Sequence, residues 1–336
     1  MISVSYHNTV NVLQGAIDTR GAQENASPPS PFGRAEWFSL LAEGGMVPLI
    51  AMAERGAEQA ILPLTQGARG LEPLVNWYSF IWRPIGNLGS HDDQMLAALA
   101  RDLRKKSHRV TFWPLPDEDG TATRLEMAFR KAGWSVARKQ CDHNHVLPVN
   151  GRSFAEYWST RPGKMRTTLA RKAKKVDIEI LTHFDPLAWA AYENIYAQSW
   201  KPAEGNPALL RQFAEAEGAA GRIRLGIARH EGVPVAAQFW TLEGGTAHIH
   251  KLAHLEEHKA LSAGTTLSAA LFEHVIDQDR AMLVDFGTGN DRYKMDWMEQ
   301  DRPRYRLDCL DLRQFAAWPV LARRGAVRLA HTIRRS

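Results

Sequence analysis

The sequence contains little cysteine: its 336 residues include two, Cys141 and Cys309, and they form no CxxC or other metal-binding spacing. This excludes a disulfide-stapled scaffold and predicts a cytoplasmic protein with free thiols. The apolar runs are far shorter than the roughly 18 residues that a membrane-spanning helix needs. The first 21 residues do not combine a basic region with an apolar core, so we expect no secretory signal.

The composition predicts a globular protein with two domains. Hydrophobic residues make up 44% and charged residues 24% of the chain, enough to build a sizeable core. The net charge of +5 is modest, but two stretches are strongly basic: RPGKMRTTLARKAKK (161–175) and the C-terminal LARRGAVRLAHTIRRS (321–336). Such stretches can attract phosphates, nucleic acid or anionic lipid; the alternative is a solvated helix face.

Hydrophobic periodicity predicts the same order of elements twice, namely strand, strand, strand, helix, strand, helix and strand. In the first half these elements are expected at 46–56, 58–67, 74–82, 90–106, 109–116, 123–133 and 134–149. In the second half, after two helices at 185–200 and 207–218, they are expected at 222–232, 233–245, 246–255, 265–279, 281–287, 291–298 and 304–312. The residues near 150 have the composition of a linker, so we expect a domain boundary there.

One candidate ligand site is the stretch HKALSAGTT, which precedes a predicted helix. Ser262, Gly264, Thr265 and Thr266 are small or hydroxyl-bearing, and Lys259 adds a cation. Backbone N–H groups at the start of a helix can bind a phosphate, particularly where small residues let it approach. The alternative is ordinary capping of the helix by Ser or Thr.

A second candidate site is DFGTGNDRYKMDWM, residues 285–298. Asp285 ends a predicted strand, Gly287 and Gly289 permit a sharp turn, and Lys294 follows on a helical turn. An acid and a lysine at a strand end could accept a proton and contact a phosphate or an oxyanion. The alternative is a salt bridge between them that fixes the turn.

Histidines alternate on the predicted strand TAHIHKLAHL. His248 and His250 could contact a substrate or pack, and we predict no metal site, because no third ligand with suitable spacing accompanies them. Strict alternation places Lys251 on the opposite face of this strand. Trp200, which closes a predicted helix before a loop, could border an acceptor pocket or simply pack.

The second half resembles the GNAT acyltransferase superfamily, in particular the FemAB-like branch of tandem GNAT-type domains that includes BioF2-like (CelD-like) acetyltransferases. Three stretches carry the resemblance: SFAEYWSTRPGKMRTTLARKAKK, HIHKLAHLEEHKALSAGTTL and above all VDFGTGNDRYKMDW, which is similar to the branch's DFG-x-G-x-x-x-YK signature. The resemblance covers roughly residues 150–310. It implies an α/β (α+β) fold of two GNAT-like domains, each with a mixed, mostly antiparallel sheet flanked by helices.

The resemblance also implies a division of the chain and a set of roles. It implies a divergent GNAT-like domain at 1–150, an acyltransferase domain at 151–311 and a basic helical tail at 312–336. The pantetheine arm of acyl-CoA (acetyl-CoA) would run beside strand 246–255. Its pyrophosphate would bind the next loop through Lys259, Ser262, Gly264, Thr265 and Thr266, although Lys259-x-x-Ser262-x-Gly264 has one glycine where the superfamily loop usually has two.

For the chemistry, direct attack of an amine on a thioester needs no covalent protein adduct. Under this interpretation Asp285 is the base or positions the amine, and Lys294 meets phosphate or the oxyanion. Tyr293 could protonate the departing thiolate, or it could be a packing residue. His248, His250, Lys251 and Trp200 would border the acceptor.

We therefore expect an N-acyltransferase acting on a small-molecule or glycan amine, such as an amino sugar of the cell envelope. A second hypothesis is FemAB-type transfer from aminoacyl-tRNA, with the basic stretch 164–175 binding the nucleic acid backbone. A third is a catalytically inactive binding protein, peripheral at the inner membrane face through residues 312–336.

Overall fold

The computed structural model describes residues 1–14, 30–86 and 92–318. The chain divides into two compact units. Within the described part, the first contains residues 1–14, residues 32–142 apart from the gap, and 303–318; the second contains 30–31 and 143–302. Residues 319–336, most of the expected helical tail, lie outside the described residues, and 312–318 hold only the short helix η7 (Phe315–Ala317).

The predicted repeat of elements is confirmed in its order. The first unit has an initial strand and helix, β1 (Ser3–His7) and α2 (Ala35–Glu43), before its copy of the repeat. The repeat elements are β2 (Pro48–Arg55), β3 (Glu58–Gly67), β4 (Gly70–Pro73), α3 (Asp92–Asp102), β5 (Arg109–Leu115), α4 (Thr121–Lys131) and β6 (Ser135–Pro148). A short helix, η3 (Leu103–Lys105), extends α3.

The second unit begins with two helices, a short helix and an edge strand: α5 (Phe154–Ser159), α6 (Gly163–Lys172), η4 (Ala173–Lys175) and β7 (Asp177–Leu181). Two further helices follow, α7 (Pro186–Ala197) and α8 (Pro207–Ala219). The repeat elements are β8 (Ile223–His230), β9 (Val233–Glu243), β10 (Thr246–His254), α9 (Ala263–Glu273), β11 (Leu283–Thr288), α10 (Arg292–Trp297) and β12 (Gln300–Leu310). The turn η5 (Glu256–Leu261) joins β10 to α9.

The sheets have matching topologies. Strand order is β1-β2-β3-β4-β5-β12-β6 in the first unit and β6-β11-β10-β9-β8-β7 in the second. Neighbouring strands are antiparallel except at β4–β5 and β10–β11, the third and fourth strands of each repeat. The predicted fold class, a mixed and mostly antiparallel α/β fold of two GNAT-like units, is confirmed.

The final strand of each repeat pairs with a strand of the other repeat. Residues 144–148 of β6 pair with β11, and residues 305–310 of β12 pair with β5. The division between the units therefore falls within β6 and β12, at 142/143 and 302/303, instead of near 150 and 311. Periodicity identifies a strand but not its partner, so this exchange could not be read from the sequence.

One expected strand is absent. Residues 74–82 form turns, and the third strand of the first unit is instead β4. Asn76 starts the turn: its side-chain oxygen accepts a hydrogen bond of 3.0 Å from the backbone N–H of Tyr78. The aromatic pattern of this stretch reflects burial rather than pairing, because Trp82 packs on Phe112 of β5 with ring centroids 5.3 Å apart.

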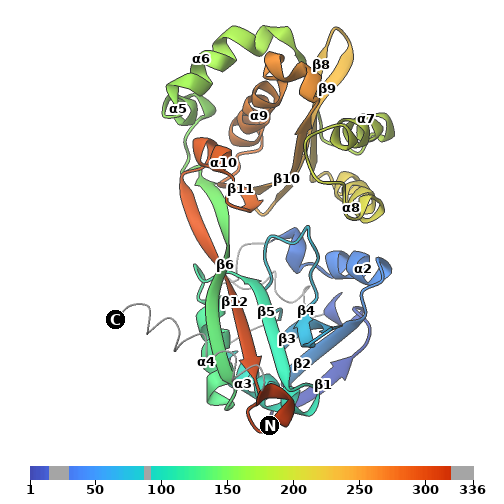
Figure 1. The fold of residues 1–336 in the computed structure, drawn as a ribbon, viewed down its shortest axis with the longest axis vertical. Coiled ribbons are helices and arrows are strands. Elements are labelled where there is room, and N and C mark those ends of the chain that lie inside the picture. Colours follow the sequence, from blue (N-terminus) through green and yellow to red (C-terminus); the bar gives the residue numbers. More distant parts are fainter. Residues whose placement is uncertain (15–29, 87–91, 319–336) are drawn as a thin grey trace. The chain divides into compact units, whose positions relative to one another are not determined.

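Helices cover both faces of the second unit's sheet. α9 packs on β8 and β9 from one side, and α7 packs on β9 and β10 from the other, with α8 beside it (Figure 1). The α9 side holds the apolar core, which includes Phe272 and Trp297. The side covered by α7 and α8 carries the polar residues described below.

Candidate active site

The parallel strands β10 and β11 are paired over three residues and then separate. Their register ends at His248 and Asp285, although β10 continues to His254 and β11 to Thr288. Beyond this point β10 remains paired with β9, and β11 remains paired with β6. Beyond their last paired residues, the facing edges of the two strands are not hydrogen-bonded to each other in the described chain. We call this separation the β10–β11 opening.

Asp285 stands where the strands separate. Its Oδ1 accepts hydrogen bonds from the backbone N–H of Gly287, at 2.7 Å, and from the side-chain amide of Asn144 on β6, at 3.0 Å. Asn144 is fully buried. These two donors orient the carboxylate.

Lys294 closes the turn after β11. Gly287 and Gly289 have positive φ values of 69° and 103°, which confirms the predicted sharp turn. The Lys294 side chain is only 5% exposed, and its ammonium donates to the carbonyl of Thr288 at 2.5 Å and lies 5.4 Å from the centre of the Phe286 ring. The turn is therefore held by this bond and by the hydrogen bond from the Gly287 N–H to the Asp285 carboxylate.

Tyr293 is 37% exposed, so most of its side chain is covered, and its ring packs edge-to-face on Phe286 with ring centroids 5.7 Å apart. Burial of its phenol raises the pKa of Tyr293, and the nearby Asp291 carboxylate adds to this. The phenol therefore keeps its proton at neutral pH.

The prediction that Lys251 faces away from His248 and His250 is wrong for both histidines, because β10 contains a bulge between Ile249 and Lys251. Ile249 pairs with Trp240 and Lys251 pairs with Phe239, so His250 is an extra residue on this strand. The His250 ring lies 5.0 Å from that of Phe239 and its Nε2 is 2.8 Å from the Thr241 hydroxyl. The bulge thus turns Lys251 to the face that His250 occupies, the one covered by α7 and α8.

On this face Lys251 forms a buried ion pair. Its ammonium lies 2.8 Å from Oε1 of Glu204, with side chains 9% and 12% exposed. The same ammonium lies over the Tyr196 ring of α7. Burial lowers the pKa of Lys251, although Glu204 opposes the shift, and burial also lowers the pKa of Lys201.

His248 and Trp200 complete the polar face. His248 is buried, and its ring is 6.2 Å from that of His250. Trp200 is half exposed and its ring lies 4.3 Å from that of His254 at the end of β10. Burial lowers the pKa of His254, so this imidazole is neutral at pH 7.

The predicted phosphate loop lies at the start of α9. Ser262, at the N-cap position, has a φ of 57°, and its hydroxyl makes no capping bond. Instead it accepts a hydrogen bond of 3.0 Å from Lys172 of α6, which also donates to the carbonyl of Ala260 at 2.7 Å. Lys259 points to solvent, where it pairs with Glu256 at 3.3 Å.

The first turn of α9 contacts the end of β10 and has one unfilled polar position. A Cβ on Gly264 would lie 3.4 Å from Nδ1 of His254, in van der Waals contact with it. Thr265 is partly buried, whereas Thr266 is buried and its hydroxyl has no hydrogen-bond partner among the described residues. A buried hydroxyl without a partner is costly, and a ligand could satisfy it.

Sequence reasoning missed four residues of this region: Asn144, His145, Lys172 and Glu204. Asn144 and His145 belong to the run CDHNH, whose partner strand could not be inferred. Burial lowers the pKa of His145, and its Nε2 has no partner in the described chain. The basic stretch containing Lys172 was visible, but its contact with the α9 loop was not.

Two negative findings concern the described residues alone. These residues include no cluster of three or more His, Cys, Asp or Glu side chains that could hold a metal ion. Nor do they include a helix of the length and apolar character needed to cross a membrane.

Residues 163–295 match the family model described as an acetyltransferase (GNAT) domain. The match contains the β10–β11 opening, the α9 loop and the turn with Lys294. No curated protein matches the sequence significantly.

Solved structures with low sequence identity share the fold over almost the whole chain. FemX is 10% identical with a TM-score of 0.65, covering 91% of this chain and 96% of that one. A tandem GNAT protein of the clavulanic acid biosynthesis pathway is 13% identical with a TM-score of 0.54, covering 91% and 98%. A C-terminal domain assigned to a lysylphosphatidylglycerol synthetase of Agrobacterium fabrum is 13% identical with a TM-score of 0.55, covering 87% and 91%. The protein thus shares the fold of these solved structures, which include a tandem GNAT protein.

Proposed function

We propose that this acyltransferase transfers an acyl group from acyl-CoA to an amine by direct attack of the amine on the thioester. The observation that carries the proposal is the separation of β10 and β11 directly after His248 and Asp285. A thioester held in this opening would have its carbonyl beside a buried polar face and next to an oriented carboxylate.

The donor would bind along the opening and across the start of α9. A pantetheine arm is an extended chain with amide groups, and it can hydrogen-bond to strand edges as an added strand does. Its phosphates would meet the backbone N–H groups of the first α9 turn, where the helix dipole favours negative charge. Lys172 braces this turn, and the Thr266 hydroxyl offers a donor that lacks a partner among the described residues.

The reaction needs a neutral amine and a way to move two protons. Asp285 would position the amine and accept its proton as nitrogen attacks the carbonyl carbon. As the carbon–sulfur bond breaks, the departing thiolate would take a proton from the Tyr293 phenol, which is protonated at neutral pH, or from water. Holding the two reactants in the right geometry can lower the barrier by about 7–11 kcal/mol.

The acceptor would lie on the face covered by α7 and α8. His248, His250 and the Lys251–Glu204 pair line this face, and Trp200 lies near the end of β10. Such a mixture of aromatic and polar groups suits a small amine or an amino sugar. The sequence resemblance to the FemAB-like branch makes an amino sugar of the cell envelope the acceptor to test first.

A second candidate donor is aminoacyl-tRNA. The observation that favours it is the basic surface of α6 and η4, where Lys164, Arg171, Lys174 and Lys175 are exposed. Clustered lysines and arginines of this kind bind the phosphate backbone of nucleic acids in a strongly salt-dependent way.

Calorimetric titration of the full chain with acetyl-CoA, with longer acyl-CoAs and with aminoacyl-tRNA tests these proposals. Saturable binding of an acyl-CoA, followed by release of free thiol in the presence of a panel of amines and amino sugars, supports the proposed reaction. Salt-sensitive binding of tRNA without any binding of acyl-CoA would replace it with the second candidate.

A further inference from the structure

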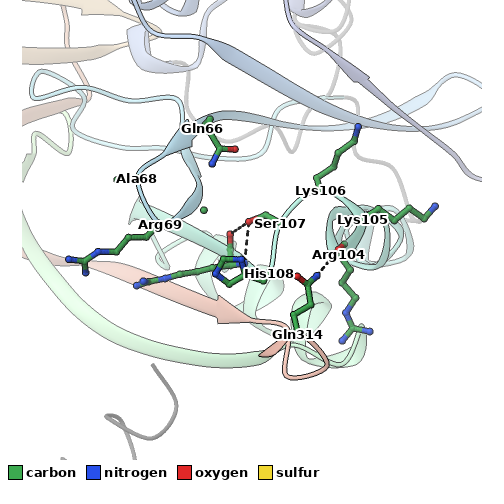
Figure 2. A pocket seen from close by; sticks show the side chains of 11 residues that line it. Gln66, Ala68, Arg69, Arg104, Lys105, Lys106, Ser107, His108 and Gln314 are labelled. Carbon is green, nitrogen blue, oxygen red and sulfur yellow. Dashed lines mark hydrogen bonds between the residues drawn. The ribbon is translucent and has the colours of Figure 1, made fainter. Parts of the chain in front are cut away.

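A basic pocket lies in the first unit, and none of its lining residues belongs to the candidate active site. It is bounded by the start of β4, the start of β5 and the segment that joins η3 to β5, and it has a volume of about 540 Å³ (Figure 2). This volume is in the range of ordinary small-molecule sites, roughly 300–1,000 Å³.

Its lining is cationic. Five arginine or lysine side chains and one histidine contribute to the wall, and none of the described lining residues carries a carboxylate. The basic residues are Arg69, Arg104, Lys105, Lys106, His108 and Arg109. Six such residues around one hollow raise the local concentration of anions.

Three of the cations are neutralised from outside the pocket. Arg109 forms a two-point ion pair with Asp308 at 2.8 and 2.9 Å. Lys105 lies 2.5 Å from Asp102, and Arg104 lies 3.7 Å from Asp311.

Arg69 and Lys106 remain as excess charge. Both are exposed, and neither has a carboxylate within ion-pair distance in the described part of the chain. Lys106 instead lies over the ring of Tyr6, 4.6 Å from its centre. The pocket therefore keeps a net positive charge that nothing in its own wall offsets.

The floor of the pocket is close-packed backbone. Gly70 has a φ of +133°, and a Cβ at this position would lie 2.3 Å from the carbonyl oxygen of Arg109. β4 and β5 thus begin side by side, which brings Arg69 next to the His108–Arg109 segment. The Gln66 amide and the Ser107 hydroxyl add neutral hydrogen-bonding groups to the same wall.

We propose that this pocket binds the phosphate group of a small phosphorylated molecule. An arginine guanidinium presents paired N–H donors that match phosphate oxygens, and a lysine adds a mobile point charge. The pocket is a local hollow about as large as a small-molecule site, whereas a nucleic acid backbone needs an extended basic stripe. The phosphate could belong to a soluble compound or to a lipid headgroup.

Calorimetric titration of the full chain with pyrophosphate tests the proposal. The test variant is Arg69→Gln with Lys106→Gln, two exposed changes that should leave the fold intact, and the matched control is Lys131→Gln on α4, an exposed lysine outside the pocket. We expect the test variant to bind pyrophosphate at least ~10-fold more weakly than wild type. The control should bind as wild type does, and both variants should keep the acetyl-CoA affinity of wild type.

A second arm distinguishes the source of the phosphate. Co-sedimentation with phosphatidylglycerol vesicles, compared with phosphatidylcholine vesicles, should be lost in the test variant alone if the phosphate belongs to a lipid. Loss of pyrophosphate binding without a change in vesicle binding indicates a soluble compound. If the test variant binds both pyrophosphate and vesicles as wild type does, the proposal is overturned.

Discussion

Asn144, near the end of the first repeat's last strand, donates a hydrogen bond of 3.0 Å to the carboxylate of Asp285 in the second repeat. The exchange of final strands makes this contact possible, because β6 pairs with β11. The candidate active site thus depends on a residue 141 positions away in the chain.

Asn144→Ala should destabilise the fold. The substitution removes one of the two donors to the Asp285 carboxylate inside a buried site, and a lost partner in such a site costs about 1–3 kcal/mol. Asn144→Asp should cost more, because it places a second negative charge beside Asp285. Urea unfolding measures both, with the exposed Asn194→Ala as control at about 0.5 kcal/mol or less. Equal stabilities of Asn144→Ala and the control would show that the bond contributes nothing.

Asp285→Asn should slow the transfer reaction and leave the binding of acetyl-CoA nearly unchanged. The amide keeps an oxygen that can accept from Gly287 but cannot accept a proton from an amine. We expect acetyl-CoA affinity close to that of wild type and thiol release slower by about 10²–10⁴-fold, the range for loss of a general base. Turnover at the wild-type rate would remove Asp285 from the proposed chemistry.

Lys172→Ala should weaken donor binding. The ammonium braces the loop before α9 through Ala260 and Ser262, and we expect a loss of about 10-fold in acetyl-CoA affinity, equivalent to about 1.4 kcal/mol. Lys174→Ala removes an equal charge from an exposed position nearby and should change the affinity little. Similar losses in the two variants would point to general electrostatic attraction instead of loop bracing.

The Lys251–Glu204 pair should show strong coupling. Lys251→Met leaves the Glu204 carboxylate buried without its cation, which costs about 3–5 kcal/mol for a buried pair. Adding Glu204→Gln should restore part of this stability. The free energies of unfolding of the two single variants and the double variant give the coupling, and simple additivity would mean that the ion pair does not form.

Stability should fall in mild acid because His145 resists protonation. Burial lowers its pKa in the folded state, so its contribution is complete above the unfolded pKa of about 6.5 and is lost as pH falls below it. The loss is at most about 1.4 kcal/mol per pH unit for one histidine. His145→Asn should flatten the decline between pH 7 and 5 relative to the exposed-site control His183→Gln. If the free energies of unfolding of the two variants fall equally between pH 7 and 5, the acid sensitivity does not come from His145.

The sequence predicts much of this fold because its periodicities are strong and its turns carry glycine. The order of strands and helices, the Gly287–Gly289 turn and the basic character of α6 could all be read directly. Three features could not. Strand partners depend on distant pairing, the bulge at His250 depends on packing against Phe239, and residues 74–82 carry a strand-like pattern that serves burial.

Hydrogen exchange followed by mass spectrometry, with and without acetyl-CoA, tests the central claim most directly. If the thioester donor lies between β10 and β11, amides in residues 249–255, 260–266 and 285–289 should exchange more slowly when acetyl-CoA is bound. Exchange that is unchanged in all three segments at saturating acetyl-CoA would contradict the account.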